Sequence, residues 1–327
     1  MALTRRMLVG SIAAATISVT TTGLDAQTFP GRQVSIIVPY PAGGFIDVST
    51  RLLAEGLRER WGKPVLIVNK PGANGKIGLA ELVRGQPDGY TLLANNDGGI
   101  ALPPALDGNF NFDFRQDYTP IAQIVETKFV IALNADVPAK TVAEFISYAR
   151  ANPGKLNYAS PGLGTTPHIA AEFFGQKTGI KMVHVPYVGA APAVTDLING
   201  VVNVYFASVP SIAGHLASPR LRIIGTLAGE RIDSLPDAPT MAQAGVQGLV
   251  VNSWLGLFGP PKLDRALVEH ISKSVSEVVA DPKWADRFRA TYADPISKSA
   301  DAFAEFYIAE VEKWKDFSAS TGIRVGQ

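Results

Sequence analysis

The sequence predicts an α/β protein in which helices cover a mostly parallel sheet. Segments with the short apolar pattern of strands alternate with segments whose apolar residues recur at helical spacing, over most of the 327 residues. Two glycine-containing loops, 39–47 and 157–168, each join an expected strand to an expected helix. Ligands of such sheets lie outside the carboxyl ends of the strands, so the two loops predict a cleft with two walls.

The first alternating unit lies before residue 100. Its expected strands are Gln33–Val38, Val65–Val68 and Thr91–Ala94. Its expected helices are Val48–Trp61 and a segment around Gly75–Arg84. In the first of these helices, apolar residues recur at intervals of four, one, four and four, which places them on one face. Residues 102–117 are rich in Asn, Asp, Pro and Phe, a composition that predicts a long loop.

A second alternating unit follows, and the chain then returns to the first. The second unit has expected strands at Ile121–Leu133, Leu156–Ala159, Met182–Val185, Val201–Ala207 and Ile223–Leu227. Its expected helices are Val142–Asn152, with Thr141 as N-cap, Pro167–Lys177 and Ala191–Asn199. The returning strand is expected at Val250–Phe258. The sequence beyond Leu263 has a helical pattern and ends with an expected helix at Phe303–Phe317.

The composition is that of a folded protein and excludes several classes of function. The formal net charge is +1, and the chain after residue 26 carries 28 basic and 28 acidic residues without a basic stripe. This balance argues against binding to nucleic acid or to an anionic membrane surface. The chain has no cysteine, which excludes disulfides, thiolate metal sites, cysteine nucleophiles and a lipid-modified cysteine that would anchor it to a membrane.

The N-terminus has the pattern of an export signal. Arg5 and Arg6 precede a short apolar region at Met7–Val19, and the small residue Ala26 marks an approximate cleavage site. A bilayer span needs about 20 apolar residues, so this region is too short to be one. The arginine pair resembles a twin-arginine signal, but such pairs also occur in ordinary secretory signals, and both routes stay open. We expect residues 1–26 to be removed and the protein to be exported; the family resemblance described below implies that it then resides in the periplasm.

The loop at 39–47 has the composition of an anion-binding turn. Gly43 and Gly44 allow the backbone to approach a ligand closely, and the first N–H groups of the following helix lack intrahelical partners. A tight turn without a ligand would use the same glycines. Asp47 either favours the positive end of its helix or accepts a hydrogen bond from a ligand or an ordered water.

The loop at 157–168 combines hydroxyl groups with exposed backbone. Ser160, Gly162, Gly164 and Thr165 suit a carboxylate that is held by N–H and O–H donors. Thr166, which precedes a proline, is expected to be a plain N-cap, a role that needs no ligand.

The sequence offers binding groups without a recognisable catalytic or metal-binding motif. The four histidines, His168, His184, His215 and His270, have no metal-ligand spacing and are expected to be structural or surface residues. Ser160 lacks the glycine two residues earlier that marks a hydrolase nucleophile, and the glycines at 162 and 164 lack the third glycine of a dinucleotide-binding loop. We therefore expect no metal, no cofactor and no catalytic residue.

Six segments resemble, in order, the signatures of a known receptor family. They are VPYPAGGFIDVSTR, VNKPGANGKIG, PDGYTLL, YASPGLGTTPHIAAEFF, HVPYVGAAPAVTDLINGVV and PDAPTMAQAG, and they extend over essentially the whole chain after the signal. The family is that of the periplasmic substrate-binding receptors of tripartite tricarboxylate transporters, also called Bug-type receptors. Any one segment would be weak evidence, whereas the ordered set is highly specific.

The resemblance implies a two-domain periplasmic-binding-protein fold, type II-like, that closes on a small ligand between its domains. We expect domain 1 at residues 27–126 and 248–327 and domain 2 at residues 127–247. The implied ligand is a small organic acid, a carboxylate or dicarboxylate, and the implied partners are the membrane components of a tripartite transporter. We expect a monomer.

The resemblance also implies which residues line the cleft. One wall would comprise Tyr40, Ala42, Gly43, Gly44 and Asp47. The other wall would comprise Ser160, Gly162, Gly164, Thr165, Gly189, Ala190 and Ser208. Asn95 and Asn96, after an expected strand, are expected to reach the same cleft. Phe45 departs from the small residue usual after the glycines; it either faces the ligand, as a stacking surface or a constriction, or packs into the core.

Two other functions stay open beside solute uptake. A sensory receptor would present its ligand-closed form to a signalling partner. Genes for transporter membrane components next to the gene for this protein would argue against a sensory role. An exported hydrolase would use Ser160 or Asp47, and turnover of a bound carboxylate that is lost on Ser160→Ala would indicate it.

Overall fold

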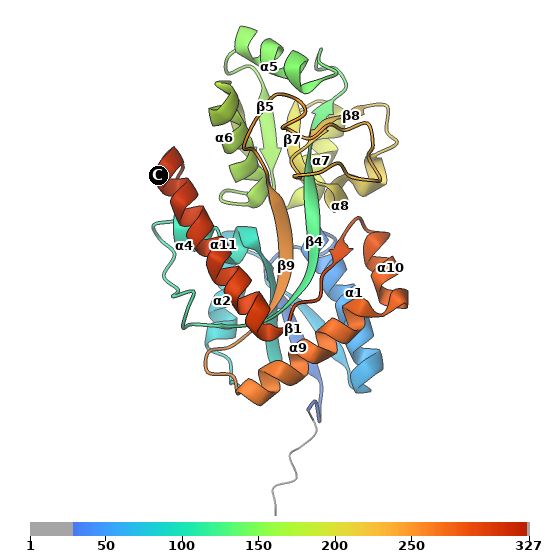
Figure 1. The fold of residues 1–327 in the computed structure, drawn as a ribbon, viewed down its shortest axis with the longest axis vertical. Coiled ribbons are helices and arrows are strands. Elements are labelled where there is room, and N and C mark those ends of the chain that lie inside the picture. Colours follow the sequence, from blue (N-terminus) through green and yellow to red (C-terminus); the bar gives the residue numbers. More distant parts are fainter. Residues whose placement is uncertain (1–28, 326–327) are drawn as a thin grey trace, which may run out of the picture.

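The computed structural model describes residues 29–325, so the expected export signal lies outside the described residues. One sheet runs through the molecule in the strand order β2-β1-β3-β9-β4-β7-β5-β6, with β8 and β10 also pairing with β4 (Figure 1). The strands are β1 (Val34–Val38), β2 (Val65–Asn69), β3 (Thr91–Asn96), β4 (Thr119–Asn134), β5 (Asn157–Ser160), β6 (Val183–Pro186), β7 (Val204–Ser208), β8 (Leu221–Thr226), β9 (Asn252–Gly259) and β10 (Asp294–Pro295).

Helices lie between most of these strands and follow the last long one. They are α1 (Phe45–Trp61), α2 (Lys76–Val83), α3 (Asp97–Ile100), α4 (Pro103–Leu106), α5 (Val142–Ala151), α6 (Thr166–Thr178), α7 (Ala190–Asn199), α8 (Val209–Ile212), α9 (Arg265–Ala280), α10 (Pro282–Arg289) and α11 (Ala300–Thr321), with 3-10 turns η1 (Ala73–Gly75) and η2 (Ala213–His215). Within residues 29–325, every helix is too short or too polar for a bilayer crossing.

The predicted alternation of strands and helices is confirmed, but the expectation of a mostly parallel sheet is wrong. The sheet is mixed, because β9 and β4 run antiparallel to their neighbours in its centre. The other differences lie mainly at element ends. α1 begins at Phe45 rather than at Val48, because the helical backbone starts directly after the extended Gly44. The strand expected from Val201 begins only at Val204, because the N–H of Val201 donates to the carbonyl of Asp196 and closes the end of α7. The loop expected over 102–117 contains the short helix α4.

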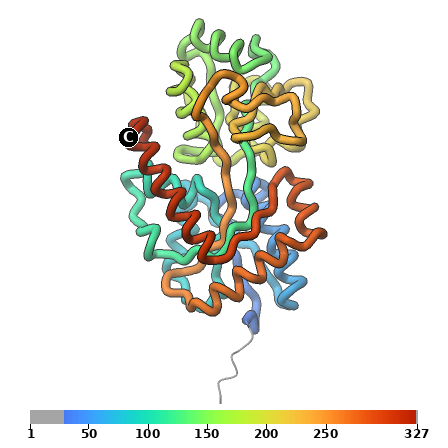
Figure 2. The backbone as a smooth tube through the Cα atoms, in the orientation of Figure 1, coloured from blue at the N-terminus to red at the C-terminus, as the bar shows by residue number. Residues whose placement is uncertain are grey.

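The long strand β4 carries the sheet from one part of the molecule to the other, and β9 lies beside its first part (Figure 1). β9 pairs antiparallel with β3 on one side and with residues 119–128 of β4 on the other. From Phe129 onward, β4 pairs instead with β7 and β8. We call the part built from β1–β3, α1–α4 and α9–α11 lobe 1, and the part built from β5–β8 and α5–α8 lobe 2. The chain passes between the lobes in β4 and again on entering β9 (Figure 2).

In lobe 1, helices cover both faces of the sheet. α1 and α9 bury Leu53, Leu57 and Val275 in one cluster with Ile36 of β1. On the other face, α2 and α11 pack on β3 and β9. Burial of each such aliphatic side chain contributes about 2 kcal/mol to the stability of the fold. The apolar stripe of α1 therefore holds this helix against the sheet, and the position of the helix determines how the loop before it is oriented.

In lobe 2, aromatic side chains from three elements form the core. Phe174 of α6 lies between Phe145 of α5 and Phe206 of β7, with ring centroids 5.9 and 5.4 Å apart. The two lobes thus have largely separate hydrophobic clusters. The domain boundaries expected at 126/127 and 247/248 stay a prediction.

Gly56 of α1 packs directly against Val278 of α9, and it provides a test of this packing. A Cβ at Gly56 would lie 2.4 Å from Cγ1 of the buried Val278. Overpacking costs about 1–3 kcal/mol, which exceeds the helix propensity gained. We therefore expect Gly56→Ala to lower the free energy of unfolding in urea denaturation. The double variant Gly56→Ala/Val278→Ala should lose less than the sum of the two single losses; strict additivity would contradict the contact.

Candidate functional site

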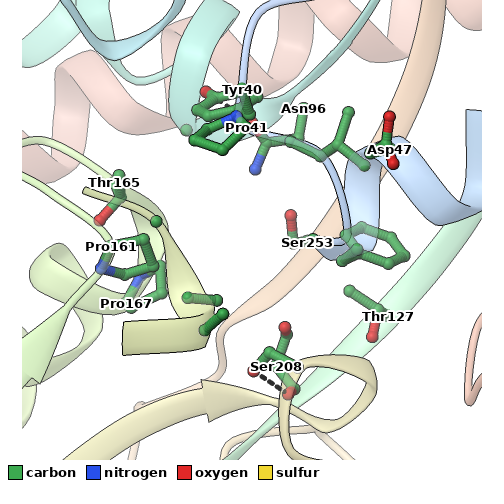
Figure 3. Close-up of a pocket in the computed structure, with 18 of the residues that line it drawn as sticks. Tyr40, Pro41, Asp47, Asn96, Thr127, Pro161, Thr165, Pro167, Ser208 and Ser253 are labelled. Atoms are coloured by element: carbon green, nitrogen blue, oxygen red, sulfur yellow. Dashed lines mark hydrogen bonds between the residues drawn. The ribbon is translucent and has the colours of Figure 1, made fainter. Parts of the chain in front are cut away.

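A pocket of about 150 Å³ lies between the lobes, beside the crossing strands (Figure 3). Its walls are the start of α1 from lobe 1 and the starts of α6 and α7 from lobe 2, and its floor is formed by β4 and β9. The expected site residues that line it are Tyr40, Ala42, Gly44, Phe45, Asp47, Asn96, Thr165, Gly189, Ala190 and Ser208. Two loops that are more than a hundred residues apart in the sequence therefore meet at one cavity.

The other expected site residues lie outside this lining. Gly162 and Gly164 line an adjoining hollow of about 420 Å³, which shares Tyr40 with the pocket. Gly43 shapes its turn, with a φ of 86° that favours glycine. Asn95 is fully buried, because consecutive residues of β3 point to opposite faces and Asn96 takes the pocket side.

The sequence did not identify the residues that the crossing strands contribute. Thr127 and Phe129 of β4 and Ser253 of β9 line the pocket, and Tyr205 and Ser211 join them from lobe 2. The alternation of β4 places residues 127 and 129 on one face. Which face meets a cavity depends on the pairing of β4 with β9, for which the sequence holds no local signal.

Phe45 takes part in both environments that the sequence left open. Its ring is half-buried against the lobe 1 core and also lines the pocket. The first residue of α1 thus joins the cavity to the apolar stripe of the helix.

Asp47 holds the first loop in shape. Its carboxylate accepts hydrogen bonds of 2.9 Å from the N–H of Gly43, from Arg51 and from Asn69. Burial would raise the pKa of Asp47, but these hydrogen bonds outweigh burial and lower the pKa below its ordinary value. Asp47 is therefore ionised, and its carboxylate is already paired with Arg51 and with the loop before α1 rather than free to bind a ligand.

Three helix starts give the pocket its electrostatic character. Gly44, Gly189 and Thr165 precede α1, α7 and α6, and residues in the first turn of each helix line the cavity. The first N–H groups of a helix lack intrahelical partners, and its N-terminus carries about half a positive charge. Asn96 points its amide nitrogen toward the cavity (Figure 3). Within the described residues, Asp47 is the charged side chain in the lining, and it is neutralised by Arg51.

Asp97 joins the two lobes directly behind the pocket. It is fully buried and accepts a hydrogen bond of 2.9 Å from Thr166 of lobe 2 and a short one from Ser253 of β9. Burial raises the pKa of Asp97 to about 7. The expectation that Thr166 is the N-cap of α6 is therefore wrong. Thr165 occupies the N-cap position, and the Thr166 hydroxyl donates its hydrogen bond to Asp97 instead.

Ser160 lies beneath the second loop and does not line the pocket. It is fully buried, and its Oγ is 2.6 Å from Nε2 of His184. The His184 ring stacks on Tyr158 and on His168, with centroids 4.8 and 4.2 Å apart. The N–H of Gly164 donates to Nδ1 of His168 at 3.1 Å. These contacts support the loop from below, and this serine–histidine pair does not face the cavity.

The two histidines of this stack are neutral at pH 7. Burial lowers the pKa of His168 and of His184 to about 4. Their contacts agree with the expected structural role. Among residues 29–325, no group of three or more His, Asp or Glu side chains is arranged to hold a metal ion.

The chain has relatives and structural neighbours along nearly its whole length. Residues 49–323 match the family described as Tripartite tricarboxylate transporter family receptor. Protein BugT of Bordetella pertussis is 29% identical over 330 residues, which cover 99% of this chain and all of BugT. The solved periplasmic binding protein BugD superposes with a TM-score of 0.85 at 29% identity, covering 90% of this chain and 99% of that one. Rpa4515 of R. palustris, solved with adipate, superposes with a TM-score of 0.87 at 29% identity over the same shares.

We predict that His168 makes the protein less stable in acid. Its folded pKa of about 4 lies below the ordinary 6.5, so the unfolded chain binds the proton first as the pH falls through 6.5. A pKa difference of one corresponds to about 1.4 kcal/mol. Between pH 7 and pH 4, wild type should therefore lose about 3 kcal/mol of unfolding free energy relative to His168→Gln.

The pH dependence of wild type alone would not isolate His168, because Asp97 changes the free energy of unfolding in the opposite direction. Its pKa is raised in the folded state, so proton uptake by Asp97 stabilises the folded state as the pH falls. Urea denaturation at several pH values measures the difference. His215→Gln, at an exposed histidine, is the control and should follow wild type. Equal pH dependence of wild type and His168→Gln would contradict the prediction.

Proposed function

The chain belongs to the tripartite tricarboxylate transporter receptor family, which confirms the resemblance in its sequence, and on that premise we propose how it works. It is a periplasmic receptor that captures a small carboxylate and delivers it to the membrane components of such a transporter. We further propose that residues 1–26 direct export by the Sec or the twin-arginine route and that the receptor acts as a monomer.

The convergence of three helix starts on one pocket is the observation that carries this proposal. An anion there is held by backbone N–H groups and by Asn96, with no Lys, Arg or His in the described lining. A site built from dipoles can bind an acid without the desolvation cost of a buried cation. It also explains how a chain with balanced charge takes an anionic ligand. The adipate in Rpa4515 indicates the same ligand class for a structural neighbour.

The position of the site between the lobes supports capture by closure. The Thr166 hydroxyl of lobe 2 donates a hydrogen bond to Asp97 of lobe 1. The two lobes therefore enclose the pocket from both sides. β4 and β9 are the connections about which the lobes can hinge. Domain 1 would then comprise residues 27–126 and 248–327 and domain 2 residues 127–247.

We propose binding without turnover. Ser160, the hydroxyl considered as a nucleophile, is buried outside the pocket lining, and Asp47 is fully paired with its own loop. A general base must come within hydrogen-bond reach of the group that it activates. Ser160 is out of reach of a ligand in the pocket, and the carboxylate of Asp47, which does line the pocket, is occupied by hydrogen bonds from Gly43, Arg51 and Asn69.

Gly44 provides the test of the site. It lines the pocket, has an ordinary backbone conformation (φ −80°), and an added Cβ would meet nothing closer than 3.9 Å. We expect Gly44→Val to fold, because an N-cap change of this kind costs about 1 kcal/mol. Its larger side chain should occupy ligand space and cover the first N–H groups of α1.

The measurement is a thermal-shift and calorimetry panel of C4–C6 dicarboxylates, citrate and aromatic acids on the mature protein. Wild type should gain melting temperature with the acids that it binds, and Gly44→Val should not. Gly108→Val is the matched control, at an exposed glycine that is outside the lining and has no atom within 4 Å of an added Cβ. Unchanged affinity of Gly44→Val for every acid that wild type binds would refute the site.

A further inference from the structure

Asn96 has the position of a helix cap but does not act as one. It is the N-cap residue of α3, with an extended backbone (φ −106°, ψ 172°) and no hydrogen bond from its side chain to the helix. An asparagine at this position ordinarily accepts a hydrogen bond from an N–H group of the first turn through its side-chain oxygen. Here the oxygen has a different partner.

That partner is the hydroxyl of Tyr40. The Tyr40 Oη donates to Oδ1 of Asn96 over 3.1 Å. Burial, followed by the nearby carboxyl of Asp97, raises the pKa of Tyr40, so the hydroxyl keeps its proton near neutral pH and can donate it. A second acceptor, Oδ1 of Asn74, is farther from the hydroxyl, at 3.5 Å. The shorter distance assigns the Tyr40 proton to Asn96.

Both partners of this hydrogen bond are held in place by lobe 1. The Tyr40 ring is half-buried against the lobe 1 core, and a Cβ on Gly99 would lie 2.4 Å from its Oη, so α3 passes directly beside the hydroxyl. The N–H of Asn96 donates to Oδ1 of Asn95 at 2.9 Å, which fixes the backbone from which the Asn96 side chain projects. The hydrogen bond therefore does not depend on how the lobes are placed.

The Tyr40 hydroxyl decides which end of the Asn96 amide faces the cavity. An amide carries an acceptor oxygen and a donor nitrogen on one carbon, so the nitrogen faces away from Tyr40 when the oxygen faces it. Nδ2 of Asn96 points into the cavity and has no protein partner among residues 29–325 (Figure 3). In the reversed orientation, the Tyr40 proton would go to Asn74 at 3.5 Å, a weaker bond.

We propose that Tyr40 is a positioning residue that makes Asn96 a hydrogen-bond donor to the carboxylate of the ligand. This inference rests on the proposed function and assigns part of its selectivity for acids. Without the Tyr40 hydroxyl, either end of the amide can face the cavity, and an oxygen there repels a carboxylate. Tyr40 acts through Asn96 and not through a contact of its own with the ligand.

Calorimetry on the mature protein at neutral pH tests the proposal. The probes are succinate, glutarate, adipate, citrate and benzoate, and the acid that wild type binds most tightly is then measured on each variant. Asn96→Ala should weaken its binding about 10- to 100-fold, the effect of a hydrogen bond to a charged group, and Tyr40→Phe about fivefold, the effect of a neutral one. Asn96→Asp should bind at least about tenfold more weakly than Asn96→Ala, because it places a carboxylate against the carboxylate of the ligand.

A double-mutant cycle separates positioning from direct contact, since Tyr40 also lines the pocket. In the Asn96→Ala background, Tyr40→Phe should change the affinity by less than about twofold, because the hydroxyl has no amide left to orient. An equal loss on Tyr40→Phe in both backgrounds would mean that Tyr40 acts on the ligand or on the pocket by itself, and it would overturn the proposal.

Tyr90→Phe and Asn111→Asp are the matched controls and should bind the acid as wild type does. Tyr90 is half-buried in lobe 1, and its hydroxyl accepts from the N–H of Gly31 at 2.9 Å, so its replacement also removes one hydroxyl hydrogen bond, away from the pocket. Asn111 is exposed and outside the lining, so Asn111→Asp adds the same charge elsewhere. Thermal unfolding without ligand should show that the Asn96 variants fold, because no cap bond of α3 is lost.

The outcomes separate this inference from the proposed function. If wild type binds none of the acids, both are overturned. If wild type binds an acid and either Tyr40→Phe or Asn96→Asp binds it as tightly, the inference is overturned and the receptor function stands.

Discussion

The antiparallel pairing of β4 with β9 is the constraint on which the rest of this structure depends. β4 is a single strand of 16 residues that pairs with β9 in lobe 1 and with β7 and β8 in lobe 2. Its backbone hydrogen bonds fix where the two lobes meet. Because β3 lies beside β9 and β7 beside β4, the ends of strands from both lobes are brought to the same place, and the pocket floor is the pair Thr127 and Ser253.

Around that floor, the binding groups are supplied by backbone rather than by charged side chains. Asp47 and Arg51 neutralise each other and fix the turn at Gly43, and the stack beneath the second loop is neutral because burial lowers the pKa of both histidines. The field in the pocket is therefore that of the helix starts. An anion can therefore enter without displacing a counter-ion.

Local features of the sequence predicted most of the fold. The apolar stripe of α1 and the N-cap Thr141, which accepts from the N–H of Glu144 at 3.2 Å, depend on residues a few positions apart. At α6 the same reasoning placed the cap one residue late. Thr166 bonds to Asp97, 69 residues away, and no local pattern records that contact. Element ends were the least predictable feature because such long-range contacts compete with the local ones.

The sequence by itself determined the α/β class, the two glycine loops before helices and, through its ordered segments, the receptor family, because these rest on neighbouring residues. Only the tertiary structure decided which side chains share the pocket. It separates Asn96 from Asn95, places Ser208 on the lining and Ser160 beneath it, and adds Ser253. The physical reason is that a strand shows two faces, and which one meets a cavity is set by partners far along the chain.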